Sequence, residues 1–523
     1  MACFYEHARR RSTPKRSIVN AARAPGPRAK PFLGGSKDWA GGFRSDPKEV
    51  YLNRPNIILI NCDDLGYGDL GCYGSEVNQT PALDKMADEG VLFTDFYMAS
   101  PVCSPSRAAM MTGCYPPRIS FGFFDGRVVL FPGSPIGLNT NEITIAKLLQ
   151  DSGYATKIVG KWHCGDQAEF LPTRHGFDGY FGLPYSNDMG RQVWDDKFGT
   201  GSNENVSEDI AETRRNLPPL PLLRDEQVIQ EQPDQSALTE RYVEESIRFM
   251  RESGDKPFFL YLAHMYVHLP LYAPTRFLKE SQNGAYGAAV AGIDWATDVL
   301  LHELRQLGIE DNTLVIFTSD NGSRMAGQGG SNGLLRGTKG TTWEGGQRVP
   351  CIMRWPSRIE AGAVCNETSS AMDLYPTLAA IANTSIPNDR IIDGKDIRPL
   401  IFGENSAKSP HEAFFYYKQD NLEAVRVGKW KLHVRKGKDR VDELYDLKSD
   451  VSESENLFDK HPEVVAELTA KIDTCRRDIG DRATDVTGEN IRPAGRVDSP
   501  DTLTHYDPDH PYIAAMYDSK DRG

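Results

Sequence analysis

The sequence predicts an α/β fold with a large, mostly parallel sheet flanked by helices, followed by a small antiparallel sheet and one helix. Continuous apolar runs are typical of strands that are buried on both faces, and four occur: 56–60, 155–159, 257–263 and 313–318. Segments with helical patterning alternate with these runs: 81–89, 143–151, 236–252 and 285–307. This alternation implies right-handed crossovers that place helices on both faces of the sheet.

Each apolar run is followed closely by polar side chains that can bind a ligand or transfer a proton. In chain order these are Asp63 and Asp64, Lys161 and His163, His264 and His268, and Asp320 and Asn321. Ligands of open α/β sheets bind beyond the carboxyl ends of the strands. We therefore expect the four polar clusters to converge on one edge of the sheet, although they are far apart in the sequence.

Four of these side chains offer only oxygen ligands: Asp63, Asp64, Asp320 and Asn321. Oxygen ligands suit Ca²⁺ or Mg²⁺ rather than zinc, which prefers histidine and cysteine. Three carboxylates at one place would repel one another without a cation. Flexible coordination and the lack of an obvious phosphate-bearing partner favour Ca²⁺ over Mg²⁺.

A cysteine lies at the expected start of a short helix. Pro105 suits a first helical turn and Gly113 a helix end, so we expect the helix to run between them, with Cys103 just before it. There the positive end of the helix dipole would lower the pKa of the thiol. The alternative is a buried structural cysteine, which is how the other eight cysteines are interpreted.

The segment from Cys103 to Arg107, which reads Cys-Ser-Pro-Ser-Arg, resembles the Cys-x-Pro-x-Arg signature of the sulfatase family. Further motifs of that family follow in the same order over roughly 55–400: Asp63-Asp64, Gly160 to His163, Thr318 to Gly322, and Leu334 to Gly346. The resemblance implies the fold of the alkaline phosphatase superfamily, in agreement with the sheet expected above. It also implies a sulfuric ester hydrolase that acts on a sulfated carbohydrate or an aryl sulfate.

The resemblance further implies a role for each site residue. A formylglycine-generating maturation enzyme would oxidise Cys103 to formylglycine (3-oxoalanine), whose hydrate attacks sulfur. Calcium would be held by Asp63, Asp64, Asp320, Asn321 and the modified Cys103. Arg107 would steady the modified residue, and Lys161 would lie beside His163, which takes the proton that triggers sulfate expulsion. His268, rather than His264, would contact the sulfate and, with Lys339, protonate the leaving oxygen.

Two alternatives remain open at this point. One is hydrolysis of a phosphomonoester or phosphonate on the same scaffold. The other is a non-catalytic protein that binds sulfated glycans, with an anion clamp of Arg107, Lys161, His268 and Lys339.

Four regions are expected along the chain. Residues 1–54 form a basic, disordered extension, 55–400 the catalytic domain, 401–480 an α+β subdomain, and 481–523 an irregular arm that wraps over the body. Within the subdomain, strands are expected at 413–417, 422–427 and 430–434 and a helix at 461–477.

Charge and hydropathy exclude several classes of protein. The chain of 523 residues has 60 basic and 73 acidic side chains, a net charge of −13, which argues against general nucleic-acid binding. It contains no apolar run of about 18 residues, so no membrane span is expected. Members of the family are typically periplasmic, secreted or lysosomal, yet the basic N-terminal residues precede no apolar core of a secretory signal. The sequence does not indicate an oligomeric state.

Overall fold

The computed structural model describes residues 54–194, 217–324, 329–513 and 515–517. The extension expected over 1–54 therefore lies outside the described residues, Arg54 excepted. The described residues belong to one compact unit. Among them, no helix is both long and apolar enough to cross a membrane.

The main sheet has eleven strands within the described ranges, five of them parallel at its centre. These five are, in spatial order, β10 (Thr313–Ser319), β1 (Asn56–Cys62), β9 (Phe258–Ala263), β4 (Ala155–Gly160) and β5 (Gly179–Gly182). The four predicted strands are confirmed as β1, β4, β9 and β10. The parallel centre confirms the predicted fold class.

Antiparallel pairing begins at the borders of this parallel centre. On one side β11 (Arg348–Arg354) pairs antiparallel with β10 and with β2 (Val91–Tyr97). Short strands β12 (Ala363–Cys365) and β13 (Ser369–Ser370) run parallel to β2. On the other side the hairpin of β7 (Pro221–Arg224) and β8 (Gln227–Glu231) pairs antiparallel with β5. The sheet is therefore mixed, with its parallel part where the polar strand ends lie.

The register aligns the carboxyl ends of the central strands. Asn61 of β1 lies opposite Thr318 of β10 and Ala263 of β9, and Ala263 lies opposite Gly160 of β4. Because parallel strands share one direction, the residues that follow each of these positions leave the sheet at the same level. This alignment brings the four polar clusters to one edge.

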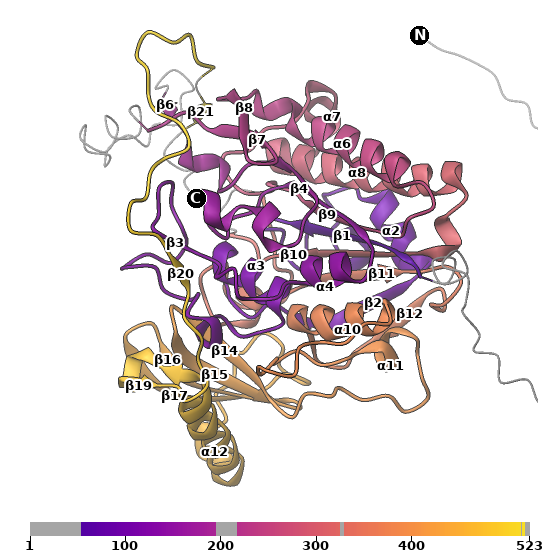
Figure 1. Ribbon diagram of the computed structural model, residues 1–523. Coiled ribbons are helices and arrows are strands. Elements are labelled where there is room, and N and C mark those ends of the chain that lie inside the picture. The colour runs from indigo at the N-terminus through magenta and orange to yellow at the C-terminus, as the bar shows by residue number, and fades with distance from the viewer. Residues whose placement is uncertain (1–53, 195–216, 325–328, 514, 518–523) are drawn as a thin grey trace, which may run out of the picture. The chain divides into compact units, whose positions relative to one another are not determined.

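Helices cover both faces of the sheet (Figure 1). Ile58 and Ile60 of β1 share a core with α2 (Pro81–Asp88), α6 (Leu238–Ser253) and α8 (Gly284–Leu307). The alternate residues Ile57 and Leu59 share the opposite core with α3 (Cys103–Thr112), α4 (Ile145–Asp151) and α10 (Leu374–Ile381). The helices predicted at 81–89, 143–151, 236–252 and 285–307 are confirmed as α2, α4, α6 and α8. Short helices α7 (Thr275–Glu280), α9 (Glu344–Gln347) and α11 (Arg398–Ile401) complete this part.

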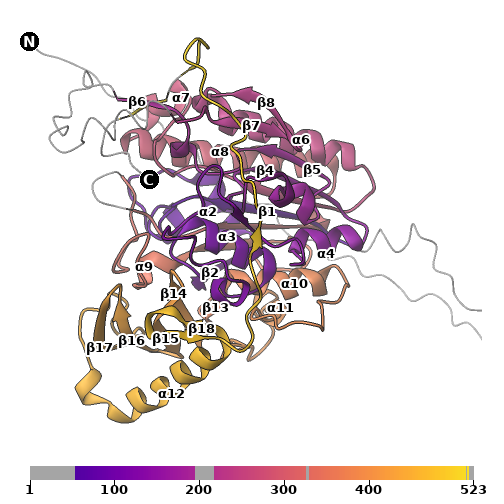
Figure 2. The same ribbon diagram turned by 60° about the vertical axis from the view of Figure 1, so that its left-hand side comes forward.

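A second sheet follows, with four antiparallel strands in sequence order. They are β14 (Phe414–Lys418), β15 (Asn421–Val427), β16 (Trp430–Lys436) and β17 (Asp439–Asp446). Leu468 and Ile472 of α12 (Pro462–Ile479) pack on its buried face, which also contacts Tyr97 and Tyr115. The small sheet and helix expected near the C-terminal end are confirmed, and Figure 2 shows α12 lying along the sheet.

The C-terminal segment returns across the body of the molecule (Figures 1 and 2). After the short pair β18 (Gly480–Asp481) and β19 (Val486–Thr487), β20 (Gly495–Arg496) pairs with β3 (Ile136–Gly137). Asp501 then exchanges two hydrogen bonds with Gln167, and β21 (Ala515–Tyr517) pairs with β6 (Gln192–Trp194). These contacts tie the end of the chain to segments that precede it by more than 300 residues.

Candidate active site

The ends of β1, β4, β9 and β10 present buried polar side chains at one edge of the sheet. They are Asp63 and Asp64 after β1, Lys161 and His163 after β4, His268 beyond β9, and Asp320 and Asn321 after β10. Asp64 and His163 have left-handed backbone, with φ of 61° and 62°. Such strain clusters at functional sites and persists only where the surroundings enforce it. Here the His163 N–H donates to the Pro184 carbonyl at 3.0 Å.

Helix α3 brings two further residues to the same edge. It begins at Cys103, two residues earlier than predicted, because Val102 is already extended and caps it. Arg107 follows one turn later and donates from Nε to Asp320 Oδ2 at 2.8 Å and from Nη1 to the Lys161 carbonyl at 3.0 Å. The Cys103 Sγ lies 3.3 Å from Asp63 Oδ1. The helix is thereby fixed to three strand ends.

A group of potential metal ligands forms at the centre. Ligand atoms of Asp63, Asp64, Cys103 and His268 lie within 4.8 Å of one another. Asn321 donates from Nδ2 to Asp64 Oδ1 at 2.8 Å, and its Oδ1 is buried without a hydrogen-bond donor in the described part of the chain. A buried acceptor without a donor is uncommon, and a cation would satisfy it. The oxygen-rich donor set therefore fits a hard divalent ion.

Three cationic side chains accompany the three carboxylates. Lys161 forms an ion pair with Asp63, Arg107 with Asp320, and Lys339 reaches Asp64 with Nζ–Oδ1 2.8 Å. All six side chains are buried or nearly so. Charge repulsion among the carboxylates, used above as an argument for a metal, is thus already offset by the protein. The case for a metal rests instead on the donor atoms and their spacing.

The buried charges shift one another's pKa values. Burial alone would raise the pKa of Asp63, but Lys161 and Arg107 hold it well below its ordinary value. Burial, together with the charge of Asp63, raises the pKa of Asp320 to about 7. Although burial disfavours the charge of Lys339, Asp64 raises its pKa, so this lysine is protonated at neutral pH.

The two histidines are neutral and oriented by backbone carbonyls. His163 Nε2 contacts the Leu130 carbonyl at 3.0 Å, which leaves Nδ1 as a buried lone pair with no partner in the described residues. Burial and Lys161 lower the pKa of His163. His268 Nδ1 contacts the Leu269 carbonyl at 2.6 Å, and its Nε2 lies 3.8 Å from Asp64. Burial and Lys339 lower the pKa of His268.

The thiol of Cys103 differs from the sequence-based expectation. Burial, followed by the charge of Asp63, raises its pKa well above the ordinary value, so the predicted lowering was wrong. The helix dipole acts at this position, but the loss of water from a fully buried sulfur outweighs it. The unmodified thiol is therefore a poor nucleophile at neutral pH.

The segment that carries Lys339 is fixed by backbone contacts to its neighbours. The N–H of Lys339 donates to the Ser323 carbonyl at 3.0 Å, and the N–H of Gly340 donates to the Pro101 carbonyl at 2.8 Å. Gly322 packs so closely that a Cβ there would lie 1.8 Å from the Gly345 carbonyl oxygen. The loops that carry Asn321, Cys103 and Lys339 thus support one another.

Sequence reasoning missed Ser186. Its Oγ accepts a hydrogen bond from Lys161 Nζ at 3.1 Å, and the residue is buried. Ser186 follows β5, whose short apolar run, residues 180–183, was not recognised as a further parallel strand. The rule that placed the other polar strand ends at this edge would have included it.

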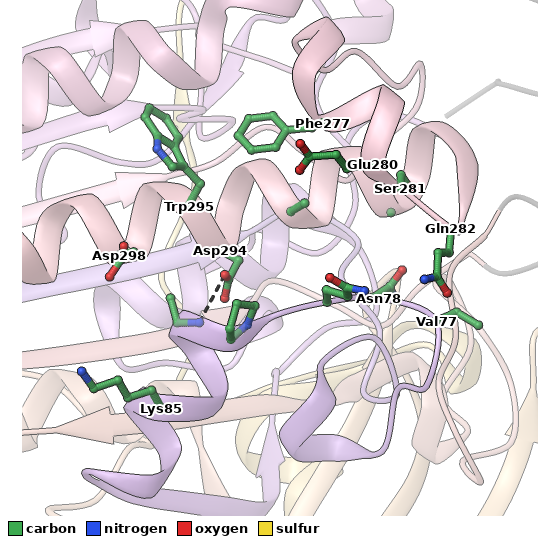
Figure 3. A pocket seen from close by; sticks show the side chains of 15 residues that line it. Val77, Asn78, Lys85, Phe277, Glu280, Ser281, Gln282, Asp294, Trp295 and Asp298 are labelled. Carbon is green, nitrogen blue, oxygen red and sulfur yellow. Dashed lines mark hydrogen bonds between the residues drawn. The ribbon is translucent and has the colours of Figure 1, made fainter. Parts of the chain in front are cut away.

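A separate cavity of about 470 Å³ lies between α2, α7 and α8 (Figure 3). Phe277 and Trp295 form its aromatic wall, and Glu280, Asp294 and Asp298 make it acidic. The carboxylate of Asp294 accepts hydrogen bonds from the N–H groups of Ala82 and Leu83, so it caps α2. None of the predicted site residues lines this cavity.

The parallel sheet and the polar cluster at its carboxyl edge agree with the alkaline phosphatase-type fold expected from the sequence. Residues 55–384 match the family profile described as Sulfatase, and residues 338–478 match a profile described as N-sulphoglucosamine sulphohydrolase, C-terminal. The chain belongs to the sulfatase family.

Comparison with individual proteins supports this family assignment. N-acetylgalactosamine-6-sulfatase of Canis lupus familiaris is 41% identical over 396 residues, which cover 72% of this chain and 71% of that protein. Arylsulfatase A of Homo sapiens is 41% identical over 391 residues, which cover 72% and 74%. The solved structure of Ps i-CgsB in complex with k-i-k-neocarrahexaose superposes with a TM-score of 0.70 at 30% identity, over 83% of this chain and 95% of that chain. The protein is accordingly an enzyme that hydrolyses sulfate esters.

Proposed function

We propose that this sulfatase releases sulfate from a sulfated carbohydrate or aryl sulfate by means of formylglycine made from Cys103, with calcium bound beside it. The observation that carries the proposal is the position of Cys103: its Sγ lies 3.3 Å from Asp63 and shares one buried cluster with Asp64 and His268. The raised pKa of the thiol makes the unmodified cysteine unsuitable as nucleophile. Once oxidised, the residue supplies a hydrated aldehyde whose hydroxyl can attack sulfur.

Calcium would be held by Asp63, Asp64, Asp320, Asn321 and the modified Cys103. Asn321 Oδ1 accepts no hydrogen bond from the described residues and could act as a ligand, and Asp64 and Asp63 belong to the cluster. A bound divalent ion supplies Lewis acidity and fixes the orientation of the ester. Mg²⁺ fits less well because it demands near-ideal octahedral geometry.

The remaining residues would hold the sulfate and move protons. Arg107, Lys161 and Lys339 surround the cluster and would offset the charge on the non-bridging oxygens. Lys339, protonated at neutral pH, would give a proton to the leaving oxygen, while neutral His268 contacts the sulfate. Nδ1 of His163, which has no partner within the described ranges, would accept the proton whose removal expels sulfate.

A sulfate-release assay tests the proposal. Protein produced with a formylglycine-generating enzyme is expected to free sulfate from aryl sulfates and from members of a panel of sulfated sugars. Cys103→Ala is expected to lose this activity, because alanine cannot be converted to an aldehyde. Full activity of Cys103→Ala would contradict the mechanism, and release of phosphate from phosphomonoesters in preference to sulfate would favour the phosphatase alternative.

Metal removal tests the calcium assignment. Dialysis against EGTA is expected to abolish sulfate release, and Ca²⁺ should restore it better than Mg²⁺ at equal concentration. Because an ion that binds only the folded state stabilises it, Ca²⁺ should also raise the unfolding temperature. Asn321→Ala should reduce this rise. An unfolding temperature and activity that do not respond to either treatment would contradict a calcium site.

A further inference from the structure

A small cavity opens beside the catalytic cluster. It is lined by Asp64, Val267, Leu269, Tyr286, Ser323, Arg324 and Gly330. Asp64 belongs to the cluster, and His268 lies between two of the lining residues in the chain. The cavity has a volume of only about 10 Å³, room for about one water molecule, so an anionic group of a substrate would meet the lining residues at its mouth rather than fill it. A group at that mouth would lie next to the scissile ester.

Arg324 enters this cavity from the loop that follows β10, three residues after Asn321. Its Nη1 is buried and has no hydrogen-bond acceptor among the described residues. No carboxylate in the described ranges lies within ion-pair distance of it. Arg324 as a whole is partly buried. Three arginines that are buried outright each have a carboxylate partner: Arg107 pairs with Asp320, Arg118 with Asp393, and Arg348 with Asp95.

The charge balance of the surroundings points to an anionic ligand. Arg107, Lys161 and Lys339 are each paired with a carboxylate of the cluster, whereas Arg324 has no carboxylate partner in the part of the chain that the structure describes. Buried donors are normally satisfied by protein, water or ligand. A guanidinium presents two parallel N–H groups that match the oxygens of a carboxylate or a sulfate.

We propose that Arg324 binds a second anionic group of the substrate, so that the preferred ester is a sulfate on an alcohol that also carries another sulfate or a carboxylate. This rests on the proposed function, because the first anion is the scissile sulfate held by the catalytic cluster. The side chain of Arg324 then selects among sulfate esters rather than taking part in the chemistry.

The experiment compares esters in matched pairs, with sulfate release as the readout. One pair is 3-carboxyphenyl sulfate and 3-carbamoylphenyl sulfate; the other is N-acetylgalactosamine 4,6-disulfate and N-acetylgalactosamine 6-sulfate. The wild-type protein is expected to prefer the anionic member of at least one pair by about 10- to 100-fold in kcat/KM, the range of a hydrogen-bonded charge pair. The pair that responds distinguishes a carboxylate from a sulfate.

Variants assign the preference to the arginine. Arg324→Gln should reduce the preference to about threefold or less, and Arg324→Lys should retain part of it, because lysine keeps the charge without the planar fork. Arg305→Gln, at an exposed position in the last turn of α8, is the matched control and should keep the full preference. Unfolding temperatures of the variants verify that they fold.

Three results would overturn the proposal. The first is a wild-type protein without preference in either pair. The second is an Arg324→Gln variant that loses activity equally on both members of a pair, which would place the guanidinium on the scissile sulfate. The third is an Arg324→Gln variant that keeps the preference. A wild-type protein that releases sulfate from no ester would instead overturn the proposed function itself, so the two failures are distinguishable.

Discussion

At the scale of single residues, Lys339 and His268 were both expected to protonate the leaving oxygen, but their surroundings give them different protonation states. Both lie beside Asp64, with Lys339 Nζ at 2.8 Å from Oδ1 and His268 Nε2 at 3.8 Å from Oδ2. Asp64 raises the pKa of the lysine, while burial lowers the pKa of the histidine. At neutral pH only the lysine of this pair carries a proton that it can give away.

The substitution Lys339→Ala tests this role. It is expected to lower kcat/KM for sugar sulfates by about 10²- to 10⁴-fold, the usual contribution of a general acid. The loss should be smaller for 4-nitrophenyl sulfate, whose leaving group needs little protonation. Rates of sulfate release for both esters provide the measurement, with Lys408→Ala at an exposed position as control. Equal losses on both esters would show that Lys339 acts only as a cation.

The sequence predicts which residues form the site better than it predicts the pKa values and contacts of those residues. The polar strand ends were predictable because they follow apolar runs, and Cys103 because of the motif around it. The direction of the pKa shift of Cys103 was not, because it depends on burial by segments far away in the sequence, such as that of Asp63. The same holds for Arg324, because only the three-dimensional structure shows that its Nη1 has no hydrogen-bond acceptor among the described residues.

At the scale of elements, the small C-terminal sheet buttresses the segment that carries Lys339. Lys431 of β16 is fully buried and reaches Glu344 at 2.9 Å, Glu453 at 3.0 Å and the Thr342 carbonyl at 2.9 Å. Glu344 also accepts hydrogen bonds from Tyr97 and Tyr416. The Arg336 guanidinium lies 3.7 Å from the centre of the Trp343 ring and donates to the Glu453 carbonyl. One buried network therefore joins both ends of residues 336–344.

Lys431→Met is expected to destabilise the protein strongly. Removal of one partner from a buried ion pair leaves the other charges uncompensated, which costs about 3–5 kcal/mol. Lys429→Met is the matched control, because Lys429 is half-exposed and its pair with Asp446 contributes about 1 kcal/mol or less. Denaturant unfolding gives both values. If Lys431→Met lowers the free energy of unfolding no more than Lys429→Met does, the claim that this network supports residues 336–344 is contradicted.

Helices and strands with a long hydrophobic pattern were predictable from the sequence, whereas very short strands were not. The long apolar runs of β1, β9 and β10 and the periodic helix α8 are evident in the sequence. Strands β5, β7 and β12 have only three or four residues, too few for a pattern to separate them from loops. The antiparallel borders of the sheet therefore could not be predicted, although they do not affect the position of the site.

At the scale of the whole molecule, a chain with a net charge of −13 gathers buried cations at the one edge where an anionic ester is proposed to bind. The surface charge does not attract such a substrate, so attraction depends on charges focused within the pocket. Segments that are distant in the sequence supply these charges, and the aligned parallel strands bring them together. The fold thus explains why motifs spread from residue 63 to residue 339 form one site.

The central claim is that Cys103 becomes the catalytic aldehyde. Its most direct test is mass spectrometry of the tryptic peptide Met86–Arg107 from protein produced with a formylglycine-generating enzyme. The account predicts a peptide in which the thiol has been replaced by an aldehyde, with sulfate release that rises with the converted fraction. A protein that retains an intact Cys103 thiol and still hydrolyses sulfate esters at full rate would contradict it.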